Sequence, residues 1–370
     1  MRILLLHGSS DMYGASKIFL QTVQLLHQKG HHCTVVLSAA GPLSEALTQN
    51  NISVHIVNLG ILRRKYFTPL GIINRIQKWS IASKQLQFIL QNENIDCIYS
   101  NTAAVLIGGY LAKKNKIKHI WHIHEIIEKP FFLHALIKWC MRNWAQKIIV
   151  VSKSVQTHWG MGILVYNGIE PLAISNKQNY RAQYAIADNA IIIGMAARIH
   201  YWKGQQYFLQ IAKTLIANEN QNAPLYFIIS GDPFSGYEYL LEEMKAFINE
   251  HHLHTRVFYI GFEKEMDIFY RSIDLLILPS QLPDPLPTVV LEAMMYGLPV
   301  AATAQGGALE MISDNGIFLP LSNVEEAATK IGSILPLETR KKLGQAGQKR
   351  VQAFFSAAAF ENNILHVFEN

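Results

Sequence analysis

The sequence has few cysteines, no long apolar run and little charge, and each absence excludes a class of protein. Its cysteines, Cys33, Cys97 and Cys140, are far apart and match no metal or redox spacing, so we expect buried thiols in a reducing compartment. No apolar stretch approaches the roughly 20 residues that span a bilayer. Only 16% of the residues are charged and 50% are hydrophobic, which excludes a disordered chain.

The chain opens with an apolar stretch, residues 1–6, that runs directly into the more polar segment 7–11. So short a stretch is more typical of a buried first strand than of a signal peptide. We therefore expect a cytoplasmic protein.

The net charge of +6 is unevenly distributed along a chain of 370 residues, which is long enough for two domains. Residues 1–180 contain 19 Lys and Arg against 7 Asp and Glu, whereas the remainder contains 14 against 20. This asymmetry favours two domains with different partners. A basic half can bind anionic lipid, nucleic acid or an acidic substrate.

Short runs rich in Val, Ile and Leu alternate with longer amphipathic stretches such as 15–29, 73–93 and 205–217. This alternation is typical of parallel sheets covered by helices on both faces. The expected strands form two series: 2–6, 32–37, 54–58, 97–100, 118–122 and 148–151, then 191–195, 225–230, 257–260, 275–278 and 300–302. The sequence thus predicts an α/β protein with two Rossmann-like doubly wound domains. Because such sheets bind ligands at the carboxyl ends of their strands, we expect the domains to face a central cleft.

The boundary between the domains is expected near residues 170–178, which lack periodicity and resemble a linker. The N-terminal domain would span 1–170, and the C-terminal domain would span 184–355. The last helical stretch, 356–370, is expected to pack back on the N-terminal domain.

Two loops of the second domain carry candidate binding residues. Arg198 and Lys203 lie five positions apart after a predicted strand, and two cations on one loop suit a diphosphate. Asp284 precedes the predicted helix 288–294, whose first N–H groups can face a phosphate. Glu292 follows eight residues later, an expected two turns inside that helix. One carboxylate can bond the hydroxyls of a donor sugar and the other a ribose, although solvated surface charges would give the same pattern.

Together these segments resemble the retaining glycosyltransferases of the GT-B fold, in the large family numbered four (glycosyl transferases group 1). The resemblance covers most of the chain, and the ordered set of motifs is far more specific than any one of them. The motifs are Asn167-Gly168-Ile169, Arg198 with Lys203, Gly231-Asp232, Gly261-Phe262, Pro279-Ser280, Asp284 with Glu292, Gly297-Leu298-Pro299-Val300-Ala301, and Gly306-Gly307 with Glu310.

The resemblance implies a donor site in the second domain. Arg198 and Lys203 would bind the phosphates, Asp284 would hold the transferred sugar and Glu292 the ribose, and the first three are counted as catalytic. The other implied donor ligands are Gly261, Phe262, Leu286 and, through backbone amides, Thr288 and Val289.

Two positions of this site depart from the family pattern. Asp284 replaces the commoner Glu, and Pro287, which has no N–H, stands where Gly is usual. Both departures leave the identity of the donor sugar open.

The first domain carries weaker signals at its expected strand ends. The family usually has two glycines after the first strand, close to the donor diphosphate, and this chain keeps only Gly14, which we include among the donor ligands. His124-Glu125 resembles the family's His-Asp pair, and this likeness gives His124 a catalytic role beside the donor sugar. Asn101 and Glu125 are the predicted acceptor ligands, although Glu125 could equally be structural.

Basic and aromatic residues mix in the segments 63–67, 75–84 and 113–118. Such stretches suit an anionic bilayer surface, where each basic residue contributes about 1 kcal/mol. A solvated basic face would have the same composition. Nucleic acid is not an expected partner, because no recognised binding module is present.

The sequence therefore predicts a retaining hexosyltransferase that moves a sugar from a UDP- or GDP-sugar to a glycan or lipid-linked acceptor. We expect this reaction in bacterial surface polysaccharide or glycolipid synthesis. There is no Asp-x-Asp metal motif, so neither metal dependence nor a cofactor is expected. Two alternatives remain: a sugar-nucleotide epimerase of the same fold, and a sugar-nucleotide-binding partner that has lost catalysis.

Overall fold

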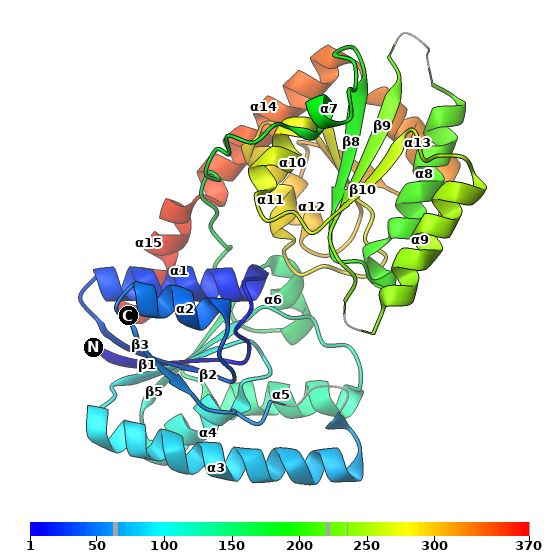
Figure 1. Ribbon diagram of the computed structural model, residues 1–370. Helices are drawn as coiled ribbons and strands as arrows, with labels where there is room; N and C mark the ends of the chain where they lie inside the picture. The colour runs from blue at the N-terminus through cyan, green and yellow to red at the C-terminus, as the bar shows by residue number, and fades with distance from the viewer. Residues whose placement is uncertain (62–65, 220–222, 235, 370) are drawn as a thin grey trace. The chain divides into compact units, whose positions relative to one another are not determined.

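A computed structural model describes residues 1–61, 66–219, 223–234 and 236–369 of the protein. The chain forms two compact units (Figure 1). Unit 1 combines Met1–Gly168 with Ala357–Asn370, and unit 2 is Ile169–Ser356. Arg63, Arg64 and Lys65 of the basic and aromatic segment lie outside the described residues.

Unit 1 contains a parallel sheet with the strand order β3-β2-β1-β4-β5-β6-β7. Side chains alternate between the two faces of the central strand β1, so that Ile3 and Leu5 join one core cluster while Leu4 and Leu6 join the other. The strands are β1 Arg2–His7, β2 His32–Leu37, β3 Ser53–Ile56, β4 Cys97–Asn101, β5 Lys118–Ile123, β6 Lys147–Val150 and β7 Ile163–Leu164. The opening apolar stretch is thus a buried strand, as predicted.

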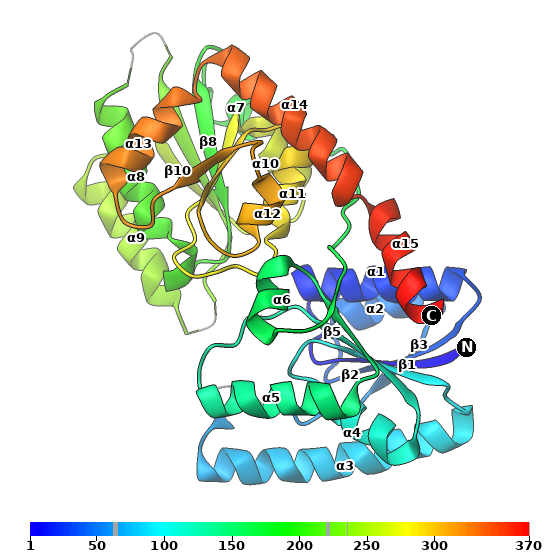
Figure 2. The same ribbon diagram turned by 180° about the vertical axis from the view of Figure 1, so that it is seen from behind.

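Helices cover both faces of this sheet. One face packs against α1, α2 and α15, and the other carries α3, α4 and α5 (Figures 1 and 2). The helices are α1 Gly14–Gln28, α2 Pro42–Gln49, α3 Pro69–Glu93, α4 Leu106–Asn115, α5 Phe131–Trp144, α6 Lys153–Trp159 and α15 Ala357–Glu369. Among the described residues, no helix is long and apolar enough to cross a bilayer.

The C-terminal helix α15 belongs to unit 1 although unit 2 precedes it in the chain. Its Phe360 and Ile364 are buried in the core cluster beside α1. Lys118 and Lys147 donate to the carbonyls of Phe368 and Val367 at 3.1 and 2.8 Å, which satisfies acceptors that a helix end leaves unpaired.

Unit 2 contains a second parallel sheet, ordered β10-β9-β8-β11-β12-β13. Helices α8, α9 and α13 share a core cluster with one of its faces, and α10, α11, α12 and α14 lie on the other (Figure 2). The strands are β8 Ile191–Ala196, β9 Leu225–Ser230, β10 Val257–Gly261, β11 Leu275–Leu278, β12 Val300–Thr303 and β13 Ile317–Leu319. The helices are α7 Tyr180–Gln183, the 3₁₀ helix η2 Tyr201–Lys203, α8 Gln205–Ala217, α9 Glu238–Glu250, α10 Met266–Ser272, α11 Thr288–Met295, α12 Ala308–Ile312, α13 Val324–Ser333 and α14 Leu337–Phe354.

The strand order reverses once in each sheet, between β1 and β4 in unit 1 and between β8 and β11 in unit 2. Doubly wound sheets bind ligands at such switch points, beyond the carboxyl ends of the strands. The candidate site residues follow these strands in both units. Two short edge strands, β7 and β13, were not predicted, because they are too short to show a periodic pattern.

Candidate functional site

The switch point of unit 2 is formed by two loops that are fixed to each other. One loop joins β8 to α8, and the other joins β11 to α11. The N–H of Gln281 donates to the carbonyl of Trp202 at 2.6 Å. Gly204 has φ +82°, and a Cβ there would lie 2.0 Å from the carbonyl oxygen of Pro279. Only glycine therefore allows the two loops this close approach.

Lys203 and Asp284 meet across these loops as an ion pair between Nζ and Oδ2. Their side chains are 17% and 11% exposed, so the pair is mostly shielded from water. The Lys203 ammonium also lies 4.0 Å from the centroid of the Trp202 ring, a favourable cation–π arrangement. The structure thus brings together two of the predicted catalytic residues.

The backbone of Asp284 is held in place by the glycine pair that the sequence singles out. The N–H of Gly307 donates to the Asp284 carbonyl at 2.7 Å. A Cβ at Gly306, which has φ +61°, would lie 2.3 Å from the same carbonyl oxygen. A Cβ at Gly307 would lie 2.2 Å from the carbonyl oxygen of Pro285. The Gly-Gly motif is therefore needed to pack the loop that carries Asp284.

Arg198 follows β8 and is half-buried. Its guanidinium lies 5.4 Å from the centroid of the Phe234 ring, and its carbonyl accepts a hydrogen bond from Gln205 Nε2 at 2.9 Å. Both predicted phosphate-binding cations therefore belong to one short loop, and each packs against an aromatic ring.

Helix α11 begins at Thr288. The N–H groups of a helix's first turn have no acceptor within the helix, so those of Thr288 and Val289 are available to an anion. Leu286, just before the helix, is buried. Glu292 lies four residues after the helix start, so the expectation that it lies two turns inside was wrong: it is one turn inside.

Tyr270 is a functional candidate that the sequence did not reveal. Its hydroxyl donates to Glu292 Oε2 at 2.7 Å, and burial, together with the charge of Glu292, raises its pKa well above the usual value. Tyr270 therefore stays a phenol that orients the carboxylate. It lies on α10, outside every motif, and no signal in the sequence marks it.

Gly261 is the last residue of β10, two strands away from β8, and Phe262 follows it. The Gly261 carbonyl accepts hydrogen bonds from Gly231 N–H at 2.7 Å and from Ser230 Oγ at 3.1 Å, which join the ends of β9 and β10. Phe262 is exposed beyond the strand. These two residues thus lie at the same edge of the sheet as Arg198.

The switch point of unit 1 holds a polar network whose buried members are neutral side chains. His7 ends β1, Asn101 ends β4, and these two residues are paired in the register of the sheet. His124 follows β5, the next strand. All three are buried, and burial lowers the pKa of His7 to about 4 and that of His124 well below its usual value. The histidines are therefore neutral at physiological pH.

The hydrogen bonds of this network determine which nitrogen of His124 carries the proton. The amide nitrogen of Asn101 donates to the carbonyl of Ala15 at 3.2 Å, which orients the amide, and to His7 Nδ1 at 3.0 Å. Asn101 Oδ1 therefore faces His124 Nε2, 2.8 Å away, and must accept its proton. His124 is thus the Nε2–H tautomer, whose Nδ1 carries a lone pair.

The other end of the network is fixed by a carboxylate. Since His7 Nδ1 accepts, His7 carries its proton on Nε2, which lies 3.0 Å from Ser16 Oγ. Ser16 in turn donates to Asp11 Oδ1 at 2.9 Å. The sequence did not reveal His7, Ser16 or Asp11, because their contact with His124 depends on the pairing of distant strands.

The two predicted acceptor ligands are both bonded inside unit 1. Asn101 is fully buried, with both ends of its amide engaged. Glu125 Oε2 accepts from the N–H groups of Ala103 and His124 at 2.9 and 3.1 Å, and burial raises the pKa of this carboxyl to about 7. Both residues thus orient the segment around His124, and their contact with an acceptor stays a prediction.

Gly14 is the first residue of α1, directly after the loop that carries Asp11. A Cβ at this position would meet nothing within 4 Å. Packing within the described residues therefore does not require a glycine here, and the space beside it is open to a ligand.

Comparisons with known proteins agree with this geometry. Residues 12–170 match the model of "Glycosyltransferase Family 4", and residues 176–350 match that of "Glycosyl transferases group 1". An uncharacterized glycosyltransferase of Methanocaldococcus jannaschii is 30% identical over 46% of this chain and 44% of its own length. The O-antigen biosynthesis glycosyltransferase WclY of Escherichia coli is 27% identical over 50% of this chain and 53% of its own. The chain thus spans about half the length of these curated relatives.

Solved structures share the whole fold. The Anabaena protein HepE, crystallised in complex with UDP-glucose, is 21% identical, with a TM-score of 0.83 over 100% of this chain and 99% of its own. At that identity the likeness establishes the fold, which is GT-B.

Proposed function

This chain belongs to the family-four glycosyltransferases of the GT-B fold, and from that membership we propose that it transfers a sugar from a nucleotide diphosphate donor with retention of configuration. The observation that carries the proposal is the pairing of Lys203 with Asp284 at the switch point of unit 2, beside the start of α11. A cation, a carboxylate and free helix N–H groups together fit a diphosphate joined to a sugar.

In the proposed reaction, the bond between the anomeric carbon and the donor phosphate breaks, and its electron pair stays with the diphosphate. The acceptor hydroxyl attacks the same face of the sugar, and its proton passes to the leaving phosphate oxygen. Arg198, Lys203 and the N–H groups of Thr288 and Val289 stabilise the charge that develops. Lys203 would exchange Asp284 for a phosphate oxygen, which frees the Asp284 carboxylate to accept from a sugar hydroxyl.

His124 in unit 1 and Glu292 in unit 2 are each oriented by a neighbour of their own unit. In the Nε2–H tautomer, His124 offers its Nδ1 lone pair to a sugar hydroxyl, and Gly14 leaves room for the diphosphate. Glu292, oriented by Tyr270, accepts from the ribose hydroxyls. UDP-sugars are the first donors to test, since the Anabaena protein of the same fold was crystallised with UDP-glucose, and GDP-sugars are the second.

A surface of unit 1 supports a lipid-linked acceptor. Leu70 on α3 and Phe131 on α5 are 80% and 75% exposed, and Phe67 and Phe132 bring the starts of these helices together with ring centroids 5.8 Å apart. Lys78 adds positive charge to α3. Exposed apolar side chains beside basic ones fit the interface of an anionic bilayer. Sedimentation with anionic vesicles tests this, because Phe131→Ser should weaken the association.

The proposed setting is the synthesis of a surface glycan in the cytoplasm, at the membrane, as the name of the Escherichia coli relative suggests. We also propose that the transfer reaction needs no metal ion. The proposed transferase needs an acceptor glycan or glycolipid for turnover, whereas an epimerase would convert the nucleotide sugar without one.

Calorimetric titration with UDP, GDP and their sugar conjugates tests the donor site. Wild type should bind one nucleotide family without added metal, and Lys203→Ala should lose at least tenfold in affinity. Lys213→Ala, an exposed lysine of α8, is the matched control and should bind like wild type. Equal affinity of Lys203→Ala and wild type would contradict the proposal.

A further inference from the structure

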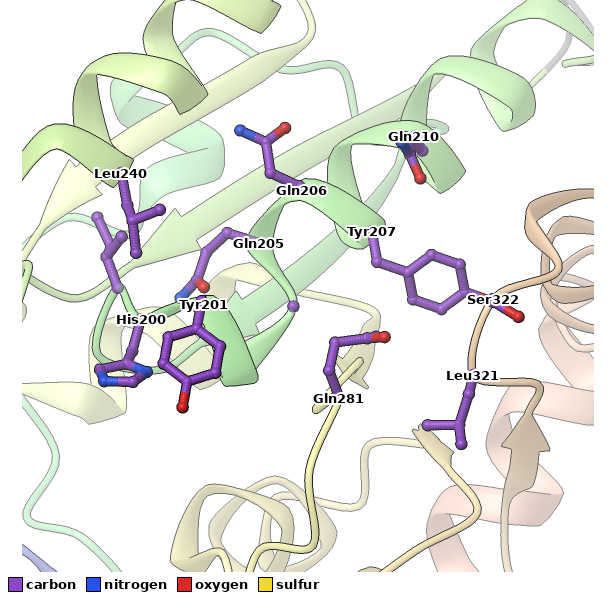
Figure 3. Close-up of a pocket in the computed structure, with 12 residues that line it drawn as sticks. His200, Tyr201, Gln205, Gln206, Tyr207, Gln210, Leu240, Gln281, Leu321 and Ser322 are labelled. Carbon is purple, nitrogen blue, oxygen red and sulfur yellow. The ribbon is translucent and has the colours of Figure 1, made fainter. Parts of the chain in front are cut away.

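Unit 2 contains a hollow of about 290 Å³ whose lining residues include neither Lys203 nor Asp284. Figure 3 shows it between the start of α8, Gln281 of the loop after β11, and the segment that follows β13. It is smaller than most pockets for drug-sized ligands, so it suits one sugar ring or a ligand of that size.

The lining of this hollow is uncharged. Amides, hydroxyls and apolar side chains make up its wall, and none of its lining residues is Asp, Glu, Lys or Arg. His200 is the one titratable imidazole there, and burial and the neighbouring Lys203 lower its pKa, so it is neutral at physiological pH. A phosphate or carboxylate would find no counter-charge in this wall.

Two amide oxygens face the hollow as acceptors with a fixed orientation. Gln205 Nε2 donates to the carbonyl of Arg198 at 2.9 Å, and Gln281 Nε2 donates to that of Pro279 at 2.8 Å. Each amide is thereby oriented, and neither Oε1 has a hydrogen-bond partner among the described residues. Gln205 as a whole is only 5% exposed, yet its Oε1 is not one of the buried side-chain atoms that lack a partner, so this oxygen stays open to a donor from a ligand.

Donors lie beside these acceptors. The first N–H of α8 that bonds back within the helix is that of Phe208, to Gly204. The N–H groups of Gln205 and Gln206 therefore have no acceptor in the helix. A hydroxyl group both donates and accepts, so a ligand with neighbouring hydroxyls satisfies both sets at once.

Rings and aliphatic side chains complete the wall. The Tyr207 hydroxyl donates to the carbonyl of Pro320 at 2.8 Å, so the phenol is tied back to the wall. Tyr201, Leu240 and Leu321 add apolar surface. Apolar walls with a few fixed polar groups are what a small-molecule site requires.

We propose that this hollow binds one neutral sugar residue of a glycan, through Gln205, Gln281 and the start of α8. The site goes beyond the proposed transfer reaction, since it needs neither donor nor turnover. It would hold a distant sugar of the glycan that the enzyme extends or has extended, and the hydrogen bond from Gln281 to Trp202 joins its wall to the Lys203 loop.

NMR titration of the full chain with methyl glycosides of neutral hexoses tests this site, with methyl glucuronide as the charged counterpart. At least one neutral glycoside should bind wild type saturably, with a dissociation constant in the millimolar range, and the glucuronide should bind at least tenfold more weakly. Gln281→Leu should weaken the binding of the neutral glycoside at least tenfold. Gln28→Leu, the same change at an exposed position of α1, should leave this binding unchanged.

Leu321→Trp provides a second variant, because it fills the hollow without removing a hydrogen bond. It should abolish glycoside binding as well. The proposal would be overturned if no neutral glycoside binds or if the glucuronide binds equally well. It would also be overturned if both variants bind the glycoside like wild type. Lys203→Ala should keep glycoside binding and lose UDP binding, so failure here is distinguishable from failure of the donor site.

Discussion

The two units place their candidate sites at the same point of the same topology, yet they build them from opposite chemistry. Unit 2 uses an ion pair, a second cation and the start of a helix, whereas unit 1 uses neutral histidines and an amide in a buried network. The charged site suits the diphosphate of a donor. The neutral site suits the orientation of hydroxyl groups, since it offers lone pairs at fixed places.

The net charge of each unit does not reveal this division. Unit 1 is the basic half of the chain, but its site is neutral, and its lysines lie elsewhere. Lys118 and Lys147 bond the end of α15, and Lys78 lies partly exposed on α3. Unit 2 is the acidic half and still carries the predicted phosphate-binding cations. Local geometry, not net charge, decides what a site can bind.

The largest expected effect is on Lys203, which gives the charged site its function. Lys203→Ala should lower kcat/KM by about 10³-fold, the loss typical of removing one group that stabilises transition-state charge. A sugar-transfer assay measures it, with Lys213→Ala as the control. Retention of more than a tenth of the activity in a folded Lys203→Ala protein would show that the ion pair is structural only.

The glycine pair behind Asp284 gives the next largest effect. Gly306→Ala should destabilise unit 2 by about 2–3 kcal/mol, because the position needs a positive φ and the Cβ would clash with Asp284. Gly332→Ala, on α13, meets nothing within 4 Å and should instead stabilise by about 0.5–1 kcal/mol. Urea unfolding measures both. Equal effects of the two changes would refute the role of close approach.

Lowering the pH should destabilise unit 1 before unit 2. Burial lowers the pKa of His7 to about 4 and of His119 and His122 to about 3, all in unit 1. Their stabilising contribution is complete above the unfolded pKa near 6.5 and is lost as pH falls towards the folded values, by about 1 kcal/mol per histidine and pH unit. Glu125, with its pKa raised to about 7, opposes this trend but is a single group.

In unit 2, burial and Lys203 also lower the pKa of His200, but this side chain is only partly buried, so its contribution is smaller and unit 2 should lose stability at lower pH. Hydrogen bonds from Lys177 and Ser175 lower the pKa of Glu265, so its contribution is lost only below its usual pKa of 4.5. Hydrogen exchange resolved by unit, between pH 6.5 and 4.5, compares the two. We expect the protection of unit 1 amides to fall first, and an earlier loss in unit 2 would contradict the contrast drawn here.

The smallest expected effect concerns which ring nitrogen of His124 carries the proton. NMR of the imidazole nitrogens should find His124 as the Nε2–H tautomer at neutral pH. Ser16→Ala cuts the link between His7 and Asp11 but leaves the Asn101 amide donating to His7 Nδ1, so His7 should keep its proton on Nε2 while unit 1 stays folded. A wild-type His124 protonated on Nδ1 would show that the hydrogen-bond direction is wrong.

Much of this fold was readable from local sequence. Apolar strands such as 2–6 and 191–195 were confirmed, because a buried parallel strand is continuous in Val, Ile and Leu. The loops with Arg198 and Asp284 were found because glycines and charges at strand ends form a recognisable order. Their contact through Lys203 was not foreseen, since it depends on β8 lying beside β11.

Residues that act through other side chains escaped the sequence. Tyr270 lies outside any motif, and only the packing of α10 against α11 brings it to Glu292. His7 ends β1, 94 residues before Asn101 in the chain, and only the pairing of β1 with β4 joins them. Such contacts depend on tertiary structure, which no periodic pattern encodes.

The most direct test of the account is hydrogen exchange of the full chain with and without UDP, resolved to short segments. The charged site of unit 2 should bind the diphosphate, so the largest protection should fall on residues 197–204 and 284–292, and Lys203→Ala should abolish it. Protection that is greatest in unit 1, or that survives in Lys203→Ala, would contradict the assignment of the nucleotide to the charged site.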